Sequence, residues 1–283
     1  MRSPIERLTG HRWTRVAANR GKRFLQHLAG AGGQAPERQV FVAGVQRSGT
    51  NMVMEALDRS LRTDVYHESD PRAFRSYMMR GSPVIADLIR RSPAPVFVIK
   101  ALCELQDLPG LMDRFPPANT VWIYRDYRDV ANSITASFRS VPETMRRLAE
   151  EGEAAGWWGR GMSDATQSFV QRVMAREPNE HTCAAMLWFI RNRLYFDLGL
   201  DRDPRVLVIR YEALVNDPEG VLKRVSDFVG IPFEGRLAHK IHPRSIGRRP
   251  VPEMDAEVHR ACEDLLASLD VAADAPLGDT VQK

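Results

Sequence analysis

The sequence has few cysteines and no long hydrophobic run. Its 283 residues include three cysteines, Cys103, Cys183 and Cys262, and their spacing is not that of a zinc site. An odd, sparse set of thiols is typical of a reducing compartment. No apolar run approaches the roughly 18 residues that a membrane span needs, and Arg and Lys interrupt residues 1–30, where a signal peptide would be apolar. We therefore expect a soluble, cytoplasmic protein without a metal site.

The basic residues are concentrated near the N-terminus. The net charge is +4, but residues 1–40 carry eight basic and two acidic side chains, so that segment is +6 and the remainder is −2. We interpret residues 1–38 as a basic, solvated helical extension. Weak contact with an anionic membrane surface or an acidic partner is the alternative. Nucleic acid is not an expected partner, because nothing in this segment resembles a nucleic-acid module and the body of the protein is not basic.

Short apolar runs alternate with amphipathic stretches after residue 38. Four runs rich in β-branched residues predict buried strands at 39–45, 95–100, 120–124 and 205–210. Amphipathic stretches predict helices at 51–61, 104–114, 127–139 and 183–199. This order predicts a three-layer α/β fold, with a central parallel β-sheet flanked by helices. We expect one domain over 39–283.

The stretch 140–180 fits no strand pattern and contains the paired tryptophans Trp157 and Trp158. We interpret it as a candidate insertion or substrate lid. The tryptophans either line a binding site for a second substrate or pin the insertion to the body.

A glycine-containing turn follows the first predicted strand and reads Gly44-Val45-Gln46-Arg47-Ser48-Gly49-Thr50-Asn51. Such a strand-to-helix turn wraps backbone N–H groups around a phosphate, and the helix dipole adds to the attraction. The Gly44-x4-Gly49 spacing matches the loop of nucleotide triphosphatases, but Thr50 and Asn51 replace the Lys and Ser/Thr that follow there. Because the cation appears earlier, at Arg47, we expect a phosphate-type anion bound without metal. An ordinary βα turn is the alternative.

A second candidate anion site is predicted at the end of the strand 120–124. Arg125 follows this strand, and Asp126 can cap the next helix. An Arg fork together with the hydroxyl of Ser133 is a good receptor for a phosphate monoester. The alternative is that Arg125 pairs with Asp129 while Ser133 packs between helices. Val130, Ile134 and Phe138 recur at i, i+4 and i+8, so we expect them to face the core.

These residues resemble those of sulfotransferases that use 3′-phosphoadenosine 5′-phosphosulfate (PAPS). The matching motifs occur in the family's order over residues 39–270, at 47–50, 125–133, 210–212 and 245–248. The family usually has Pro where this chain has Tyr127. The resemblance implies a P-loop-type fold and a nucleotide bound by Arg47, Ser48, Gly49, Thr50, Asn51, Arg125, Ser133, Tyr211, Ser245, Ile246, Gly247 and Arg248. In this interpretation Arg125 and Ser133 hold the 3′-phosphate, and no metal is required.

The resemblance also implies catalytic roles. Lys100, at the end of the strand 95–100, would stabilise the transferring group, Arg47 the leaving phosphate, and Ser245 would assist. Members with phenolic acceptors use a His shortly after the lysine, and this chain has none there. Members that act on sugars or on tyrosine in proteins use a Glu after the second strand, where this chain has Glu68.

Several alternatives to these catalytic roles remain open. The other candidate bases are His67 and Glu104. Glu68 could instead cap a helix near Pro71, and Lys100 could be a solvated strand-end lysine.

The expected reaction is therefore sulfonate transfer from PAPS to an acceptor hydroxyl or amine, on a sugar, a peptide or a lipid-like molecule. One alternative is a P-loop kinase or nucleotide hydrolase, which would require magnesium and ATP. Another is a non-catalytic nucleotide-binding protein. His239 and His242 are three residues apart and precede Pro243, so we expect a loop there and no metal ligands.

Overall fold

The computed structural model describes residues 21–22, 26, 36–138, 140–242 and 246–275. The centre of this described part is a five-stranded sheet formed by β1 (Arg38–Ala43), β2 (Thr63–Tyr66), β5 (Val96–Ala101), β6 (Ala118–Tyr124) and β7 (Val206–Arg210). All pairings are parallel, and the strand order is β2-β5-β1-β6-β7. Nearly every strand residue is buried, as in parallel sheets covered on both faces. The predicted α/β fold is confirmed.

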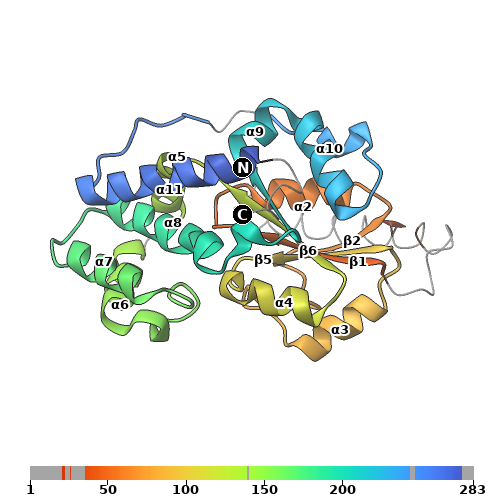
Figure 1. Cartoon of the computed structure of the whole chain (residues 1–283), viewed down its shortest axis with the longest axis horizontal. Coiled ribbons are helices and arrows are strands. Elements are labelled where there is room, and N and C mark those ends of the chain that lie inside the picture. Colours follow the sequence, from red (N-terminus) through yellow and green to blue (C-terminus); the bar gives the residue numbers. More distant parts are fainter. Residues whose placement is uncertain (1–20, 23–25, 27–35, 139, 243–245, 276–283) are drawn as a thin grey trace, which may run out of the picture.

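Helices cover both faces of this sheet (Figure 1). Side chains alternate along a strand, so Val40 and Val42 belong to one core while Phe41 and Ala43 belong to the other. The first core includes residues of α2 (Thr50–Asp58), α9 (Tyr211–Asn216) and α10 (Pro218–Val229). The second core includes residues of α3 (Ser82–Arg90), α4 (Leu108–Arg114), α5 (Tyr127–Ser137), α8 (Glu180–Asp197) and α11 (Ala256–Asp274). None of the described helices has both the length and the apolar character that crossing a membrane requires.

The stretch 140–180 is mostly helical. It contains α6 (Val141–Glu151), the 3-10 turn η2 (Gly152–Ala155) and α7 (Asp164–Met174). Met145, Leu148 and Val170 are buried in the same core as α8, so these helices pack on the body. The role of this stretch as a lid stays a prediction. The other short elements are the hairpin strands β3 (Phe74–Arg75) and β4 (Met78–Met79) and the 3-10 turns η1 (Leu105–Asp107), η3 (Leu200–Arg202) and η4 (Gly235–Ala238).

A buried arginine connects this helical stretch to the sheet. The Arg191 guanidinium donates to the carbonyl oxygens of Trp157 (2.8 Å) and Leu102 (3.4 Å). It lies 5.5 Å from the centroid of the Trp157 ring, which stacks on Trp158. Burial lowers the pKa of Arg191 to about 10, so the group stays charged at neutral pH. Trp157 packs on Arg191, and neither tryptophan lines the central cavity, which favours the pinning interpretation.

Two side chains of the predicted N-terminal extension contact the body, although most of residues 1–38 lie outside the described part. Lys22 Nζ donates to the main-chain oxygen (2.7 Å) and the carboxylate (2.8 Å) of Asp58. Gln26 is buried, and its Nε2 donates to the Thr63 carbonyl oxygen at 2.9 Å. Burial also lowers the pKa of Lys22. These two residues are therefore not solvated as expected, because they satisfy polar groups at the turn between α2 and β2.

Candidate active site

The loop between β1 and α2 has the backbone of an anion receptor. Gly44, Arg47 and Gly49 have positive φ angles of 145°, 71° and 99°, and such left-handed residues turn successive N–H groups toward a common centre. A Cβ atom on Gly44 would lie 2.2 Å from the Ile123 carbonyl oxygen, and one on Gly49 would lie 2.4 Å from the Tyr211 ring. The first turn of α2 has neither a side-chain cap nor an acidic residue. Its dipole and amide groups are therefore available to an anion.

Two motifs that are far apart in the sequence meet at this loop. Arg47 Nε donates to the hydroxyl oxygen of Ser133, on α5, at 2.8 Å. Ser48 is fully buried, and its hydroxyl has no hydrogen-bond partner within the described part of the chain. The loop thus contains a polar group that a bound anion could satisfy.

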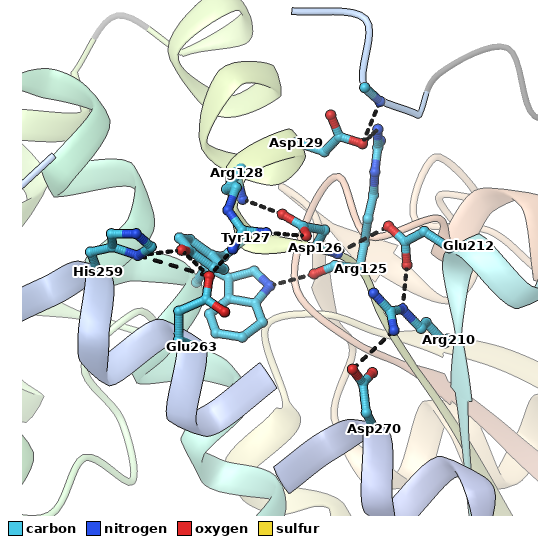
Figure 2. A network of polar contacts seen from close by, with 12 residues as sticks. Arg125, Asp126, Tyr127, Arg128, Asp129, Arg210, Glu212, His259, Glu263 and Asp270 are labelled. Atoms are coloured by element: carbon cyan, nitrogen blue, oxygen red, sulfur yellow. Dashed lines mark hydrogen bonds and ion pairs between the residues drawn. The ribbon is translucent and has the colours of Figure 1, made fainter. Parts of the chain in front are cut away.

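Arg125 lies at the carboxyl end of β6, where the Asp129 carboxylate (Figure 2) and an aromatic ring hold its guanidinium. Its guanidinium is 4.6 Å from the centroid of the Tyr211 ring, and its Nη2 is 2.9 Å from Asp129 Oδ2. The same Asp129 oxygen accepts a hydrogen bond from Gly247 N at 3.2 Å. The predicted alternative of an Arg125–Asp129 ion pair is therefore present. It does not remove Arg125 from the site, because Arg125 also lines the cavity.

Hydrogen bonds fix the backbone around Arg125 (Figure 2). Asp126 caps α5 by accepting from Arg128 N at 2.8 Å, as predicted. Glu212 Oε1 accepts from Asp126 N at 3.1 Å, and Trp188 Nε1 donates to the Arg125 carbonyl oxygen at 2.9 Å. The main chain that carries Arg125 is thus anchored from both α8 and α9.

Lys100 and Glu68 form an ion pair at the same edge of the sheet. Lys100 is only 2% exposed, so it is not a solvated strand-end lysine. Its Nζ also donates to Asn51 Oδ1 in the first turn of α2, at 2.6 Å. Residues 71–73 form a turn, so the alternative in which Glu68 caps a helix near Pro71 is wrong. Lys100 therefore connects the phosphate loop to the carboxylate of Glu68.

The two other candidate bases face different surroundings. His67 is buried, with its Nε2 3.8 Å from Asp58 Oδ2. Glu104 Oε1 accepts from Met79 N at 2.7 Å, and burial raises the pKa of this carboxyl. Glu68 lines the central cavity, whereas His67 and Glu104 are not part of its wall.

One cavity of about 650 Å³ is lined by residues of the 44–51 loop and by Glu68, Lys100 and Arg125. The predicted site residues that line it are Arg47, Gly49, Thr50, Asn51, Glu68, Lys100, Arg125, Ser133 and Tyr211. Ser48 is buried in the loop, and Gly247 reaches the site through Asp129. Ile246 packs on the core of α2, whereas Arg248 is exposed. Ser245 lies outside the described residues.

The sequence did not reveal six apolar or aromatic residues of the cavity wall, which are Met52, Tyr77, Leu102, Cys103, Phe138 and Ile241. The expectation that Phe138 faces the core with Val130 and Ile134 is wrong. Val130 and Ile134 are buried, but Phe138 is 40% exposed. The reason is that α5 ends at Ser137 and Phe138 is extended, with φ −127° and ψ 124°. Leu102 and Cys103 could have been suspected, since they directly follow the Lys100 segment.

No group of three or more His, Cys, Asp and Glu side chains in the described ranges is placed to hold a metal ion. His239 and His242 lie in the irregular segment after η4. The phosphate loop also lacks the hydroxyl that binds magnesium in nucleotide triphosphatases, because Asn51 occupies that position.

The fold and the cavity define an α/β protein of the P-loop type, with a glycine-containing loop after its first strand and a Lys–Glu ion pair at the carboxyl edge of its sheet. The family model described as "Sulfotransferase domain" matches residues 37–246. This match covers well over half of the chain. The chain belongs to the sulfotransferase family.

Solved structures of sulfotransferases are similar to this chain in fold. The sulfotransferase domain from the curacin biosynthetic pathway is 16% identical, with 83% of this chain and 99% of that chain covered and a TM-score of 0.53. The sulfotransferase domain of the Synechococcus PCC 7002 olefin synthase is 16% identical, with 86% and 98% covered and a TM-score of 0.49. A mouse sulfotransferase complexed with PAP is 14% identical, with 84% and 88% covered and a TM-score of 0.43. No curated protein matches the chain in sequence.

Proposed function

We propose that this protein transfers a sulfonate group from PAPS to an acceptor hydroxyl or amine. The observation that carries the proposal is that two anion receptors, the 44–49 loop and Arg125, border one cavity. The two receptors are connected by a hydrogen bond from Arg47, in the loop, to Ser133, which would bind the 3′-phosphate together with Arg125. A nucleotide with anionic groups at both its 5′ and 3′ positions has charge in two places and suits two receptors. Membership of the sulfotransferase family supports the same reaction.

The residues present fit this donor nucleotide. The amides of 47–51 and the Arg47 side chain would hold the 5′-phosphosulfate at the uncapped start of α2. The Arg125 fork and the Ser133 hydroxyl would hold the 3′-phosphate. The residues that would complete the nucleotide site are Tyr211, Ser245, Ile246, Gly247 and Arg248.

In the transfer step, the acceptor oxygen forms a bond to sulfur while the bond between sulfur and the 5′-phosphate oxygen breaks. The electron pair of the broken bond leaves on the phosphate, and the acceptor proton goes to Glu68. As in phosphoryl transfer, the protein contributes mainly positioning and charge stabilisation. The Lys100 ammonium contacts both Asn51 and Glu68. It is therefore placed to stabilise the charge that moves between acceptor and donor, while Arg47 stabilises the leaving phosphate.

Glu68 is the base that we propose. It lines the cavity and contacts Lys100, whereas Glu104 already accepts from the main chain of Met79. Leu102 stands two positions after Lys100, and no His follows that lysine closely. These observations support the Glu-base type of sulfotransferase over the His-base phenol type.

We place the catalytic domain at 39–283, preceded by the basic extension 1–38, with 140–180 as a candidate insertion or lid. The three cysteines are free and buried, which supports the cytoplasmic location that we propose.

A comparison of ligands in thermal unfolding tests the donor. We expect adenosine 3′,5′-bisphosphate to stabilise the protein, by about 2.7 kcal/mol at 100 times its Kd, and ATP with magnesium to give a smaller shift. Arg125→Ala should remove most of the bisphosphate shift. Arg172→Ala, which changes an exposed arginine on α7, should leave the shift intact. Stabilisation by ATP with magnesium alone would reject the proposed donor and favour a kinase or nucleotide hydrolase.

A further inference from the structure

The wall of the cavity next to the Glu68–Lys100 pair is apolar. Leu102 and Cys103 follow Lys100 at the end of β5, and both line the cavity. The Cys103 thiol contacts the carbonyl oxygen of Tyr77 at 3.8 Å, so Tyr77, which also lines the cavity, belongs to the same side. Burial raises the pKa of Cys103 to about 12, so this group stays an uncharged thiol at neutral pH.

Tyr77 is held at the tip of a strained hairpin. The strands β3 and β4 are antiparallel, and Ser76 and Tyr77 form the two-residue turn between them. Their φ angles are 51° and 67°. A two-residue hairpin turn with positive φ at both positions normally uses Asn and Gly, and a bulky residue there is a genuine outlier. Such strain persists only when surrounding contacts impose it, and it concentrates at binding sites.

Contacts behind the hairpin keep Tyr77 in this position. Glu104 Oε1 accepts from Met79 N at 2.7 Å, and Arg80 N donates to the Ala73 carbonyl oxygen at 2.8 Å. Because Glu104 and Cys103 come directly after the β5 segment that carries Lys100, the hairpin is anchored to the strand end that carries the proposed chemistry. The Tyr77 side chain is 70% exposed and still borders the cavity, so it stands at the cavity mouth.

Phe138 supplies a second partly exposed aromatic ring to the cavity wall. It follows the end of α5, five residues after Ser133, and is 40% exposed. Exposing an aromatic ring costs free energy unless another apolar surface covers it. Among the described residues at the β2 and β5 ends, the charged lining groups are Glu68 and Lys100, which pair with each other, and the Cys103 thiol beside them is uncharged. A charged or heavily hydroxylated acceptor would find few polar partners here.

We infer that the acceptor is an apolar alcohol, in which the hydroxyl is carried by an aliphatic or ring-shaped body that packs between Tyr77, Leu102 and Phe138. This inference rests on the proposed function and selects the lipid-like class over sugars and peptides. Tyr77 and Phe138 act on specificity, since their rings contact the acceptor body and not the reacting oxygen.

A panel of acceptors tests this inference on the full chain. With PAPS as donor, release of adenosine 3′,5′-bisphosphate is measured with 1-octanol and cyclohexylmethanol, and with N-acetylglucosamine and a tyrosine-containing peptide. We expect kcat/KM for the apolar alcohols to exceed that for the sugar and the peptide at least tenfold. Phe138→Ala should raise KM for the apolar alcohols about tenfold, while the bisphosphate thermal shift stays unchanged. Met78→Ala, in the same hairpin but outside the cavity wall, should leave KM unchanged.

Replacing Tyr77 by glycine distinguishes a role of this residue in acceptor binding from a purely structural role. Gly adopts positive φ without strain, so Tyr77→Gly should raise the melting temperature and, at the same time, raise KM for the apolar alcohols about tenfold. A purely structural Tyr77 would give no increase in KM. Faster turnover of the sugar or the peptide, or no turnover of either alcohol, overturns the inference when the bisphosphate shift is intact. Loss of the bisphosphate shift itself overturns the proposed function, and this inference with it.

Discussion

Lys100 is the residue on which the proposed chemistry converges. It is nearly fully buried, and its ammonium bonds to Asn51 and pairs with Glu68. A buried ammonium needs such partners, because desolvation without them costs several kcal/mol. The same contacts place its charge between the phosphate loop and the proposed base, which is where a developing negative charge needs stabilisation.

Replacement of Glu68 by Gln tests the proposed base. General-base catalysis contributes roughly 10²–10⁴-fold, so we expect Glu68→Gln to lower kcat by about that factor. The thermal shift with adenosine 3′,5′-bisphosphate should survive, because the side chain does not belong to the proposed nucleotide receptors. Glu55→Gln is the matched control, since Glu55 lines the same cavity from α2, and it should keep its activity. Unchanged turnover in Glu68→Gln would remove Glu68 from the mechanism.

The sequence predicted the residues of the proposed nucleotide site better than those of the proposed acceptor site. Arg47 and Ser133 were recognisable because each belongs to a motif with fixed spacing, and the structure brings them within 2.8 Å. Tyr77 carries no such signal, since its hairpin has strands of only two residues. Phe138 continued the periodic pattern of Val130 and Ile134, and only the end of α5 at Ser137 turned it toward the cavity.

At the scale of secondary-structure elements, a half-buried ion pair stabilises the connection between α2 and β2. Asp58, the last residue of α2, accepts from Lys22, and its other carboxylate oxygen is 3.8 Å from His67 Nε2. Burial alone would raise the pKa of Asp58, but the nearby imidazole of His67 and the charge of Lys22 outweigh it and lower the pKa to about 2. Since an unfolded Asp titrates near 3.9, ionised Asp58 stabilises the folded state.

Asp58→Asn should therefore lower the free energy of unfolding by about 2–3 kcal/mol at pH 7. The wild-type advantage is fully present above about pH 5 and is lost as the pH falls through 2, because below the folded pKa the carboxyl is protonated in both states. Urea unfolding at a series of pH values measures this. Asp87→Asn, which removes an exposed pair on α3, should cost under about 1 kcal/mol. A penalty for Asp58→Asn that does not change between pH 4 and 2 would contradict the assignment.

Strands and helices were predictable to different degrees. The strands β1, β5, β6 and β7 are near-continuous runs of buried apolar residues, and their positions follow from composition alone. β2 is four residues long and contains Asp64 and Thr63, so periodicity could not distinguish it from a loop. Lys22 and Gln26 could not be placed either, since their partners are main-chain oxygens and a carboxylate some 36 residues away.

At the scale of the whole molecule, the helix α11 holds the ends of β6 and β7 together, and Figure 2 shows its contacts with Arg210 and Tyr127. Asp270 accepts from the Tyr124 hydroxyl at 2.6 Å and from Arg210 Nη1 at 2.9 Å. About two helical turns closer to the start of α11, Glu263 accepts from the Tyr127 hydroxyl at 2.6 Å. Burial and Asp270 together raise the pKa of Tyr124, so its hydroxyl keeps its proton. A distant part of the chain thus fixes the strand ends that carry Arg125 and Tyr211.

Tyr124→Phe removes one hydrogen bond to a charged group and leaves the ring in place. Hydrogen bonds to charged groups contribute about 1.5–3 kcal/mol, so we expect a loss of that size in the free energy of unfolding, measured with urea. Ser268→Ala, on the exposed side of α11, should change stability by less than about 0.5 kcal/mol. Equal stabilities of Tyr124→Phe and the wild type would show that α11 is held by its apolar contacts alone.

The carboxylate of Asp129 would make the proposed nucleotide binding an exchange of one anion for another. One of its oxygens already bonds to Arg125 and to the main chain of Gly247, so an arriving 3′-phosphate would replace an anion that belongs to the protein. Few hydrogen bonds are gained in such a replacement, and the advantage of the ligand lies in its charge. A phosphate monoester carries nearly two negative charges at neutral pH, while a carboxylate carries one. The contacts of Asp129 would therefore favour a doubly charged group over a singly charged one at the proposed 3′-phosphate site.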